Sequence, residues 1–286
     1  MPPSKVTIQL YPSYPINNGR RELPTLRYLR HVKEIRLVES DSVPPLCIEV
    51  NGRILGVVDP WDSWKRPSPD RHYQYTRYLL ERIKELKPPL IFKYQFRRGV
   101  PYLPGTISAG YPCFKRFSGT ADLPTRARPI DITARMRTYD HDRLHVVEQA
   151  KRLGQEGYRI HVDLVDMDQY LADLWNSQIG FDWRGSGMLT YRMIEYIRAG
   201  VVPILHPLGS EWPVREDVIL EDGVHCVYCS DPNEFANEAR RLLADPAKIE
   251  MIRRNLLELW DTKLCPEAQG YWTWEKLKAA LVASQQ

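Results

Sequence analysis

The stretch QIGFDWRGSGMLTYRMIEYIRAGVVPILHP, residues 178–207, decides the fold of this chain. It opens with an apolar run, passes two glycines, continues with helical spacing to residue 200 and closes with a second apolar run. A strand, a glycine-containing turn, a helix and another buried strand form a βαβ unit of a parallel sheet. The sequence therefore predicts strands at 178–183 and 201–207, joined by a helix over 185–200.

The same alternation continues on both sides of this stretch. Two Asp-Pro pairs within 230–264 each open a helix, because proline is favoured in a helix's first turn. Strands that alternate with helices favour a parallel sheet. The further predicted elements are strands at 129–136 and 158–165, a strand pair or turn at 217–229, and helices at 141–157, 167–177 and 273–283.

The first half of the chain follows the pattern less regularly. Asn51-Gly52, inside an alternating run over 45–60, is a strong hairpin signal. Residues 99–128 are rich in Gly and Pro, and 117–128 is the expected interdomain linker. We again predict a parallel sheet. The other predicted elements are strands at 5–12, 34–40 and 89–96 and helices around 23–33 and at 70–86.

Length and composition limit the class of protein. A chain of 286 residues is long enough for two domains, and 43% apolar with 27% charged residues is ordinary globular composition. Disordered, collagen-like and coiled-coil classes are excluded. The sequence contains neither a long apolar run nor a signal-peptide pattern, so we expect a cytoplasmic protein without a membrane span. Five scattered cysteines fit a reducing compartment.

The two halves carry opposite charge. Residues 1–127 have a net charge of +10 and residues 128–286 a net charge of −6. This asymmetry indicates an anionic partner for the first half, or else chance and solvated helix faces.

The glycine-containing loop can bind phosphate. Glycine lets the backbone approach a ligand, and a helix N-terminus presents free N–H groups and partial positive charge. We therefore expect a diphosphate at Ser186, Gly187, Met188 and Thr190, with a plain structural turn as the alternative. The third glycine of the dinucleotide fingerprint is absent.

Two segments carry a resemblance to a known family. The stretch GSGMLTYRMIEYIRAGVVPIL at 185–205 resembles the donor-binding segment of GT-B glycosyltransferases, and 213–255 is similar to the strand and Asp-Pro helices that follow it there. The likeness is greatest to exostosin-like and group 1 type C-terminal domains. It implies an α/β chain of two Rossmann-like domains facing a cleft. The expected parts are 1–120 on the acceptor side, 128–262 binding the nucleotide sugar, and 263–286 packing back on the body.

The resemblance also assigns donor-binding residues. Glu195 matches the acid that accepts hydrogen bonds from ribose hydroxyls. Arg135 and Arg137 match basic positions after the domain's first strand, where guanidinium groups suit phosphate, and Arg192 lies one turn into the helix. These arginines also fit a solvated strand end. The expected substrate is a nucleotide-diphosphate sugar, with no cofactor.

One departure from the family pattern bears on the mechanism. Retaining members carry a second Glu eight residues before Glu195, where this chain has Gly187. We therefore expect inversion, which needs a general base to deprotonate the acceptor hydroxyl. The candidates are Asp59 and Asp62, near a strand end, and less so His72; a turn aspartate and a helix cap are the structural alternatives.

The acceptor side is predicted from cations near strand ends. Gly19, Arg20, Lys93 and Arg97 are the expected acceptor-binding residues, although each alone fits a surface position. The acceptor of the hexosyl or pentosyl group would be a cell-surface glycan precursor or a hydroxymethylated DNA base, the latter tracked by the basic half. A non-catalytic nucleotide-sugar-binding protein and a nucleotide-sugar epimerase are the alternative functions.

Three patterns invite a metal assignment, and we expect none of them to bind one. Asp166-Met167-Asp168 opens a helix, where acids favour the positive end of the dipole. His141 and His145 are four residues apart without the glutamate of the zincin motif. The pair at 226 and 229 is a single CxxC with no second one in the chain.

Overall fold

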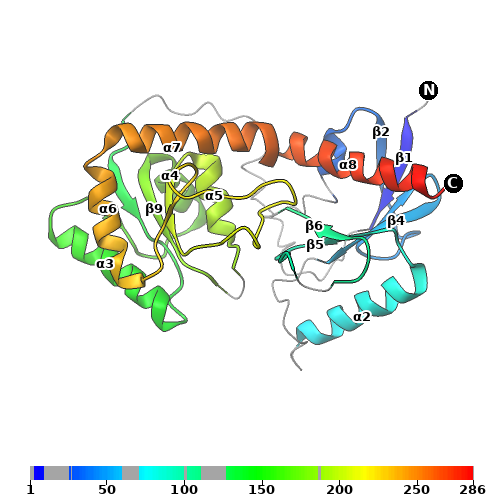
Figure 1. Cartoon of the computed structure of the whole chain (residues 1–286), viewed down its shortest axis with the longest axis horizontal. Coiled ribbons are helices and arrows are strands. Elements are labelled where there is room, and N and C mark those ends of the chain that lie inside the picture. The colour runs from blue at the N-terminus through cyan, green and yellow to red at the C-terminus, as the bar shows by residue number, and fades with distance from the viewer. Residues whose placement is uncertain are drawn as a thin grey trace. The chain divides into compact units, whose positions relative to one another are not determined.

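The computed structural model describes residues 3–9, 26, 28–59, 71–99, 102–110, 127–185 and 188–285, with the backbone alone over 71–78. These residues form two compact units (Figure 1). The first holds the described residues up to 110, Glu211–Ile219 and the chain from Lys263 onward. The second runs from 127 to Ser210 and resumes at Leu220–Thr262. The expected boundaries did not place 211–219 with the first unit.

The second unit is built on a parallel sheet, as predicted. Its strand order is β11-β10-β9-β7-β8, and all neighbouring pairs are parallel. Apolar residues from adjacent strands lie side by side, as Ile132 does with Ile179. The strands are β7 (Ile130–Thr133), β8 (Ile160–His161), β9 (Ser177–Asp182), β10 (Val202–Leu205) and β11 (Val227–Tyr228).

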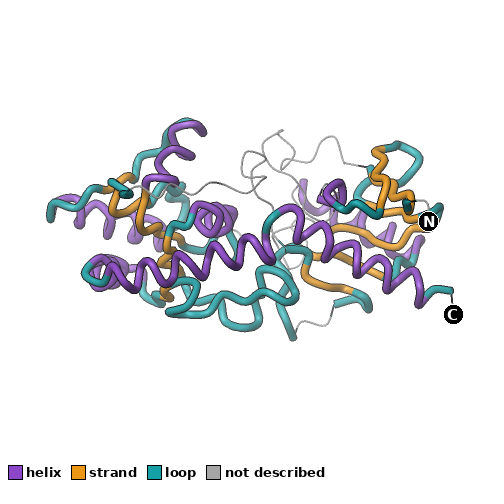
Figure 2. Tube along the Cα trace, turned by 90° about the horizontal axis from the view of Figure 1, so that it is seen from above, coloured by secondary structure: helices purple, strands orange, loops and turns teal. Residues whose placement is uncertain are grey.

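Helices cover both faces of this sheet (Figure 2). Contacts place α3 with α6, and α4 with α5, and right-handed crossovers put the two sets on opposite faces. Aspartates cap three of these helices, at Asp140, Asp166 and Asp245. The helices are α3 (His141–Gln155), α4 (Met167–Asn176), α5 (Tyr191–Ala199), a 3₁₀ turn (Pro232–Glu234), α6 (Phe235–Leu243) and α7 (Pro246–Leu259).

Helix α5 begins later than the sequence predicted. It starts at Tyr191, with Thr190 as its N-cap, and ends at Gly200 in the left-handed region at φ 62°. The glycines at 185 and 187 therefore precede the helix instead of opening it. The helix packs closely on β9, because a Cβ at Gly180 would lie 2.4 Å from the Tyr196 ring.

The first unit has a mixed sheet, so the predicted parallel sheet is wrong here. The order is β2-β1-β3-β4-β5-β6, and β3 is antiparallel to both β1 and β4. The cause is the predicted hairpin, whose Asn51 and Gly52 both have positive φ, at 51° and 85°. The strands are β1 (Ser4–Ile8), β2 (Ile35–Glu39), β3 (Cys47–Val50), β4 (Arg53–Asp59), β5 (Leu90–Lys93) and β6 (Thr106–Ser108).

Three helices of this unit have described bounds. They are the 3₁₀ helix η2 (Tyr28–His31), α2 (Arg71–Leu86) and α8 (Pro266–Ala283); a π-helical turn, Trp260–Leu264, precedes α8. Within 23–33 the described residues Leu26 and Tyr28–His31 are helical, in keeping with the predicted helix, while 23–25 and 27 lie outside the described residues. Helix α8 brings Trp274 and Leu277 into the core. Gly270 permits this, because a Cβ there would lie 2.2 Å from the Tyr28 carbonyl oxygen.

The segment Glu211–Ile219 is fixed to the first unit by arginines. Arg98 donates to the carbonyls of Glu211 and Glu216. Arg215, 2% exposed, binds Asp217 and the Lys263 carbonyl and lies over the Trp272 ring. In the described part of the chain, no helix has the length and apolar character needed to cross a membrane.

Candidate functional site

The strand order of the second unit marks a ligand-binding edge. The chain leaves β7 for β8 on one side, whereas β9 pairs with β7 on the other, so the connections diverge between β7 and β9. In open α/β sheets ligands bind at the carboxyl ends of the strands beside such a point. The described residues that follow β7 and β9, at 134–140, 183–185 and 188–190, therefore form the candidate site.

Asp182, the last residue of β9, organises this edge. Its carboxylate is 1% exposed, accepts a hydrogen bond from the Thr190 hydroxyl and lies 2.8 Å from Nη1 of Arg192. The Thr190 oxygen in turn accepts from the Met193 amide and so caps α5. This network joins the first turn of α5 to the end of β9. Arg192, expected on the diphosphate, forms a part-buried ion pair with Asp182, its side chain 15% exposed.

Arg192 also holds the end of β7. Its Nε donates to the Arg135 carbonyl at 3.1 Å. Burial acts to lower the pKa of Arg192, but the Asp182 carboxylate together with Tyr196, Tyr170 and Glu195 outweighs it and raises the pKa above its ordinary value. The guanidinium is therefore charged throughout the range in which the protein would act.

Arg135 is held in a second buried cluster. Its guanidinium binds Asp173, contacts the His161 ring and donates to the Asp163 carbonyl. Burial acts to raise the pKa of Asp173, but hydrogen bonds from His161 and Gln169 and the charge of Arg135 hold it below the usual value. Arg135, like Arg192, thus serves to fix the strand ends.

Arg143 is a further residue of the site, which the sequence analysis did not identify. From the buried face of α3 it donates to the carbonyls of Arg184 and Trp183, each at 2.9 Å, and to that of Arg137 at 3.3 Å. Burial lowers its pKa. The sequence feature that could have identified Arg143 is its position in register with the apolar stripe of 141–157. A charge on a buried helix face needs partners.

Two arginines remain exposed at this edge. Arg137 is exposed, and among the described residues its guanidinium has no hydrogen-bond partner. Arg184 has a side chain 56% exposed and lies 3.6 Å from the Asp142 carboxylate. These two cations can reach a ligand without breaking a buried contact.

Glu195 lies inside the unit, 2% exposed. It accepts a hydrogen bond from the Tyr170 hydroxyl of α4. Burial, together with the Glu195 charge, raises the pKa of Tyr170 well above its ordinary value, so the tyrosine is a stable donor. A ribose hydroxyl at Glu195 would add to this bond or replace it.

At the same strand ends, four buried polar atoms have no hydrogen-bond partner among the described residues. They are the Thr133 hydroxyl at the end of β7, Nε of Arg135 and both ring nitrogens of His206, which follows β10. His206 is 4% exposed and makes an edge contact with the Trp183 ring at 5.6 Å. Burial lowers the pKa of His206 to about 4, against smaller opposing effects of Asp182 and the Met188 backbone. A neutral imidazole at this edge was not expected.

The loop between β9 and α5 is described in part. Met188 is half-buried and Leu189 is buried. The expected contacts at Ser186 and Gly187 lie outside the described residues, so the assignment of this loop to a diphosphate stays a prediction. Thr190 is present as the α5 cap, with its hydroxyl engaged by Asp182.

The first unit brings together two of its predicted residues. Asp59 ends β4 and Lys93 ends β5, with Oδ2 and Nζ 2.9 Å apart and side chains 19% and 8% exposed. Gln95 follows in the left-handed region at φ 51°, buried, a strained conformation for a non-glycine residue. The predictions at Asp62, Gly19 and Arg20 and the His72 side chain lie outside what the structure describes.

Arg97 does not join this pair in the described contacts. Its guanidinium lies over the Trp212 ring at 5.6 Å, and its amide donates to the Tyr102 hydroxyl. It is half-buried. Its role toward an acceptor remains a prediction.

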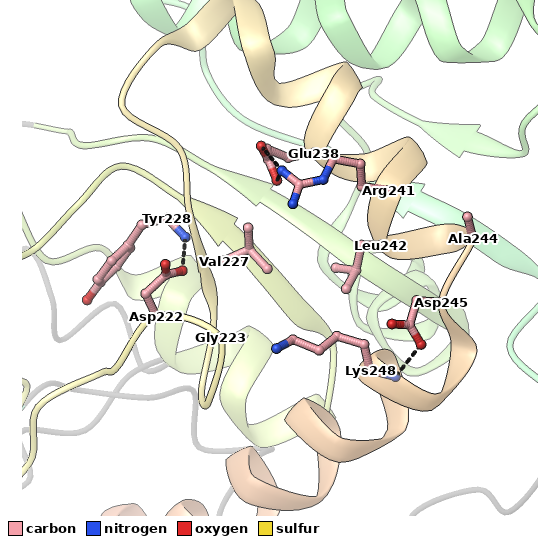
Figure 3. Close-up of a pocket in the computed structure, with 10 residues that line it drawn as sticks. All are labelled: Asp222, Gly223, Val227, Tyr228, Glu238, Arg241, Leu242, Ala244, Asp245 and Lys248. Atoms are coloured by element: carbon pink, nitrogen blue, oxygen red, sulfur yellow. Dashed lines mark hydrogen bonds and ion pairs between the residues drawn. The ribbon is translucent and has the colours of Figure 1, made fainter.

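A pocket of about 710 Å³ opens elsewhere in the second unit (Figure 3). Several of its charged side chains are engaged locally: Glu238 pairs with Arg241, and the carboxylate of Asp245 accepts from the amide of Lys248. None of the predicted site residues lines it. We assign it no function.

The three sequence patterns considered for metal binding lie in different environments in the structure. Over the described ranges, no group of three or more His, Cys, Asp or Glu residues is arranged to hold a metal ion. Asp166 caps α4 by accepting from the Gln169 amide. Cys226 and Cys229 are buried with raised thiol pKa values, owing to burial. His141 and His145 lie side by side, with Nε2 atoms 3.1 Å apart.

Comparisons with known proteins bear on the fold. No protein-family model matches the sequence, and no curated protein matches it. Solved structures do. S. aureus TarM, solved with fondaparinux, alpha-GlcNAc-glycerol and UDP, gives a TM-score of 0.50 at 11% identity over 78% of this chain and 50% of TarM.

Two further structures are similar. The pneumococcal O-GlcNAc transferase GtfA, solved with UDP and GlcNAc, gives a TM-score of 0.48 at 12% identity over 79% of this chain and 52% of GtfA. Anabaena HepE with UDP-glucose gives 0.47 at 12% identity over 79% of this chain and 72% of HepE. The chain spans about half the length of TarM and GtfA. The TarM likeness shows the fold: this chain has the α/β architecture of the GT-B glycosyltransferases.

Proposed function

We propose that this chain is a glycosyltransferase that moves a sugar from a nucleotide-diphosphate sugar to a hydroxyl acceptor. The observation that supports it is the carboxyl edge of the second sheet, where exposed arginines, the N-terminus of α5 and unsatisfied buried polar atoms lie at the divergence of β7 and β9. The GT-B fold adds support, because the TarM structure contains UDP.

The diphosphate is the group that this edge suits best. Arg137 and Arg184 supply exposed guanidinium groups, and the first turn of α5 supplies backbone N–H groups. Charge that develops on the leaving diphosphate would be stabilised by these donors, without an essential metal. Asp182, Arg192, Arg135 and Arg143 would keep the donors in place instead of contacting phosphate. Glu195 would receive the ribose hydroxyls beside Tyr170.

The catalytic base would come from the first unit. Asp59 is the described candidate, with its carboxylate oriented by Lys93. In an inverting reaction it would take the proton of the acceptor hydroxyl as the sugar carbon forms its new bond and the diphosphate leaves. Asp62 is the second candidate. NMR of the anomeric proton of the product distinguishes inversion from retention.

The +10 charge of residues 1–127 supports an anionic acceptor. The two candidates remain a glycan precursor and hydroxymethylated DNA. Retention on duplex DNA in low salt, lost as salt rises, would support DNA; absence of binding at low salt would exclude it.

The test of the proposed function uses a panel of UDP-, GDP- and ADP-sugars, with thermal shift and donor hydrolysis as readouts. At least one donor should raise the Tm and be hydrolysed. Arg137→Ala and Glu195→Ala should weaken that effect about tenfold or more, as expected for a lost charge-assisted hydrogen bond. Arg159→Ala is the matched control, because it removes an exposed cation that precedes β8, at the opposite edge of the sheet. If no nucleotide sugar binds, the proposal fails.

A further inference from the structure

The His141–His145 pair on α3 has the geometry of a metal chelate. The two residues are one helical turn apart, with Nε2 atoms 3.1 Å apart and ring centroids 4.2 Å apart. Because the nitrogens are closer together than the ring centres, the rings converge at their Nε2 edges. In the metal-free pair one ring donates a hydrogen bond to the other.

This spacing matches the bond lengths of late transition metals. With metal–nitrogen bonds of about 2.1 Å, a separation of 3.1 Å gives a nitrogen–metal–nitrogen angle of about 95°. That angle suits square or octahedral coordination and is near the tetrahedral value. Both histidines would bind as neutral rings, the donor ring moving its proton from Nε2 to Nδ1.

The pair is accessible, and its position on the helix keeps it clear of the buried network. His141 is exposed and His145 half-buried, whereas Arg143, Val146 and Val147 form the buried face of α3. The carboxylates of Asp140 and Asp142 flank the first turn and attract a cation. Their attraction offsets the repulsion between a metal ion and the positive end of the helix dipole.

Against the expectation from the missing zincin glutamate, we propose that His141 and His145 bind a divalent late transition-metal ion such as Ni²⁺, Zn²⁺ or Cu²⁺. The two imidazoles supply two ligands, and water or an external ligand fills the remaining positions. Hard cations such as Mg²⁺, which prefer oxygen, would not bind there. The site is independent of the proposed transferase reaction, because no donor-site residue is a ligand.

The first experiment is chromatography of the untagged full chain on Ni²⁺-chelate resin. The wild-type protein should be retained and eluted by imidazole. His141→Ala, His145→Ala and the double variant should pass through. His225→Ala is the matched control, since it removes a half-buried histidine away from the pair, and it should be retained like wild type.

A second measurement guards against binding by denatured protein. Zn²⁺ at ten times its Kd should raise the Tm of wild type by about 2–5 °C and leave the double variant unchanged, while Mg²⁺ shifts neither. Circular dichroism confirms that the variants fold, which their exposed helical positions favour. Equal retention, or an equal Zn²⁺ shift, in wild type and the double variant would overturn the proposal.

Discussion

The carboxyl edges of the two sheets are built differently. In the second unit the edge is held by a buried network, in which Asp182 ties Thr190 and Arg192 while Arg135 binds Asp173. In the first unit the described edge carries the ion pair of Asp59 with Lys93, whose side chains are 19% and 8% exposed. A network of buried charges fixes its backbone. The Asp59 carboxylate, whose side chain is 19% exposed, can be reached by water and so can take part in chemistry.

This difference separates structural cations from ligand-binding ones. A buried guanidinium cannot leave its carboxylate for phosphate without exposing an unpaired charge. The arginines that bind the donor should therefore be the exposed ones, at 137 and 184, instead of those at 135 and 192. The following experiments test this comparison, from the largest expected effect to the smallest.

Asp182→Asn should have the largest effect. It leaves the part-buried Arg192 beside a neutral amide and disturbs the cap of α5. We expect a loss of about 3 kcal/mol in the free energy of unfolding of the second unit, measured by urea denaturation. A loss below about 1 kcal/mol would show that the network does not hold the edge.

The pH dependence of stability should report His206. Its folded pKa of about 4 lies below the ordinary 6.5, so between these values the unfolded chain binds a proton that the folded chain does not. Stability should therefore fall as the pH drops through this window, by about 2 kcal/mol from pH 7 to pH 5. His206→Phe, which cannot titrate and retains a ring beside Trp183, should lack this contribution; equal pH slopes would contradict the assignment.

Lys93→Met should cost less than Asp182→Asn. The methionine fills the volume of the lysine stem, and the partly exposed Asp59 carboxylate can be solvated by water. We expect about 1–2 kcal/mol in urea denaturation. If Asp59 is the base, transfer activity should fall more steeply in Asp59→Asn than in Lys93→Met; an equal loss in both would argue for a merely structural pair.

Arg137→Ala should leave stability unchanged, since the side chain is exposed. Its effect should appear only in donor affinity, measured by titration of the nucleotide sugar identified above. Arg192→Ala should show the opposite behaviour, with a large loss of stability as its main effect. Were Arg137→Ala to destabilise the fold as much as Arg192→Ala, the distinction between the two arginine classes would be wrong.

Much of the fold could be predicted from local signals. One Asp-Pro pair opened the 3₁₀ turn that leads into α6, the other opened α7, and Asn51-Gly52 formed its hairpin turn. The error in the first sheet came from ignoring this hairpin's consequence, since a two-residue turn makes its strands antiparallel. β6 was not predicted because three residues carry too little periodicity. Helix α5 starts late because Thr190 caps its N-terminus, whereas the prediction started the helix at the earlier glycines.

The candidate site was predictable in place but not in detail. Strand ends could be located, and with them Asp59, Lys93 and the arginines. The sequence could not predict which arginines form ion pairs with aspartates. Asp173, the partner of Arg135, lies 38 residues away in the chain, and Asp182, the partner of Arg192, lies 10 residues away. His206 had no distinguishing neighbours in the sequence.

By itself the sequence determined the alternation of strands and helices, the caps and the basic first half, because these follow from local periodicity, backbone preference and summed charge. The tertiary structure alone decided the strand order, the point where β7 and β9 diverge, and which charges are paired. Those depend on residues far apart in the chain being packed together, where burial makes every unpaired charge costly.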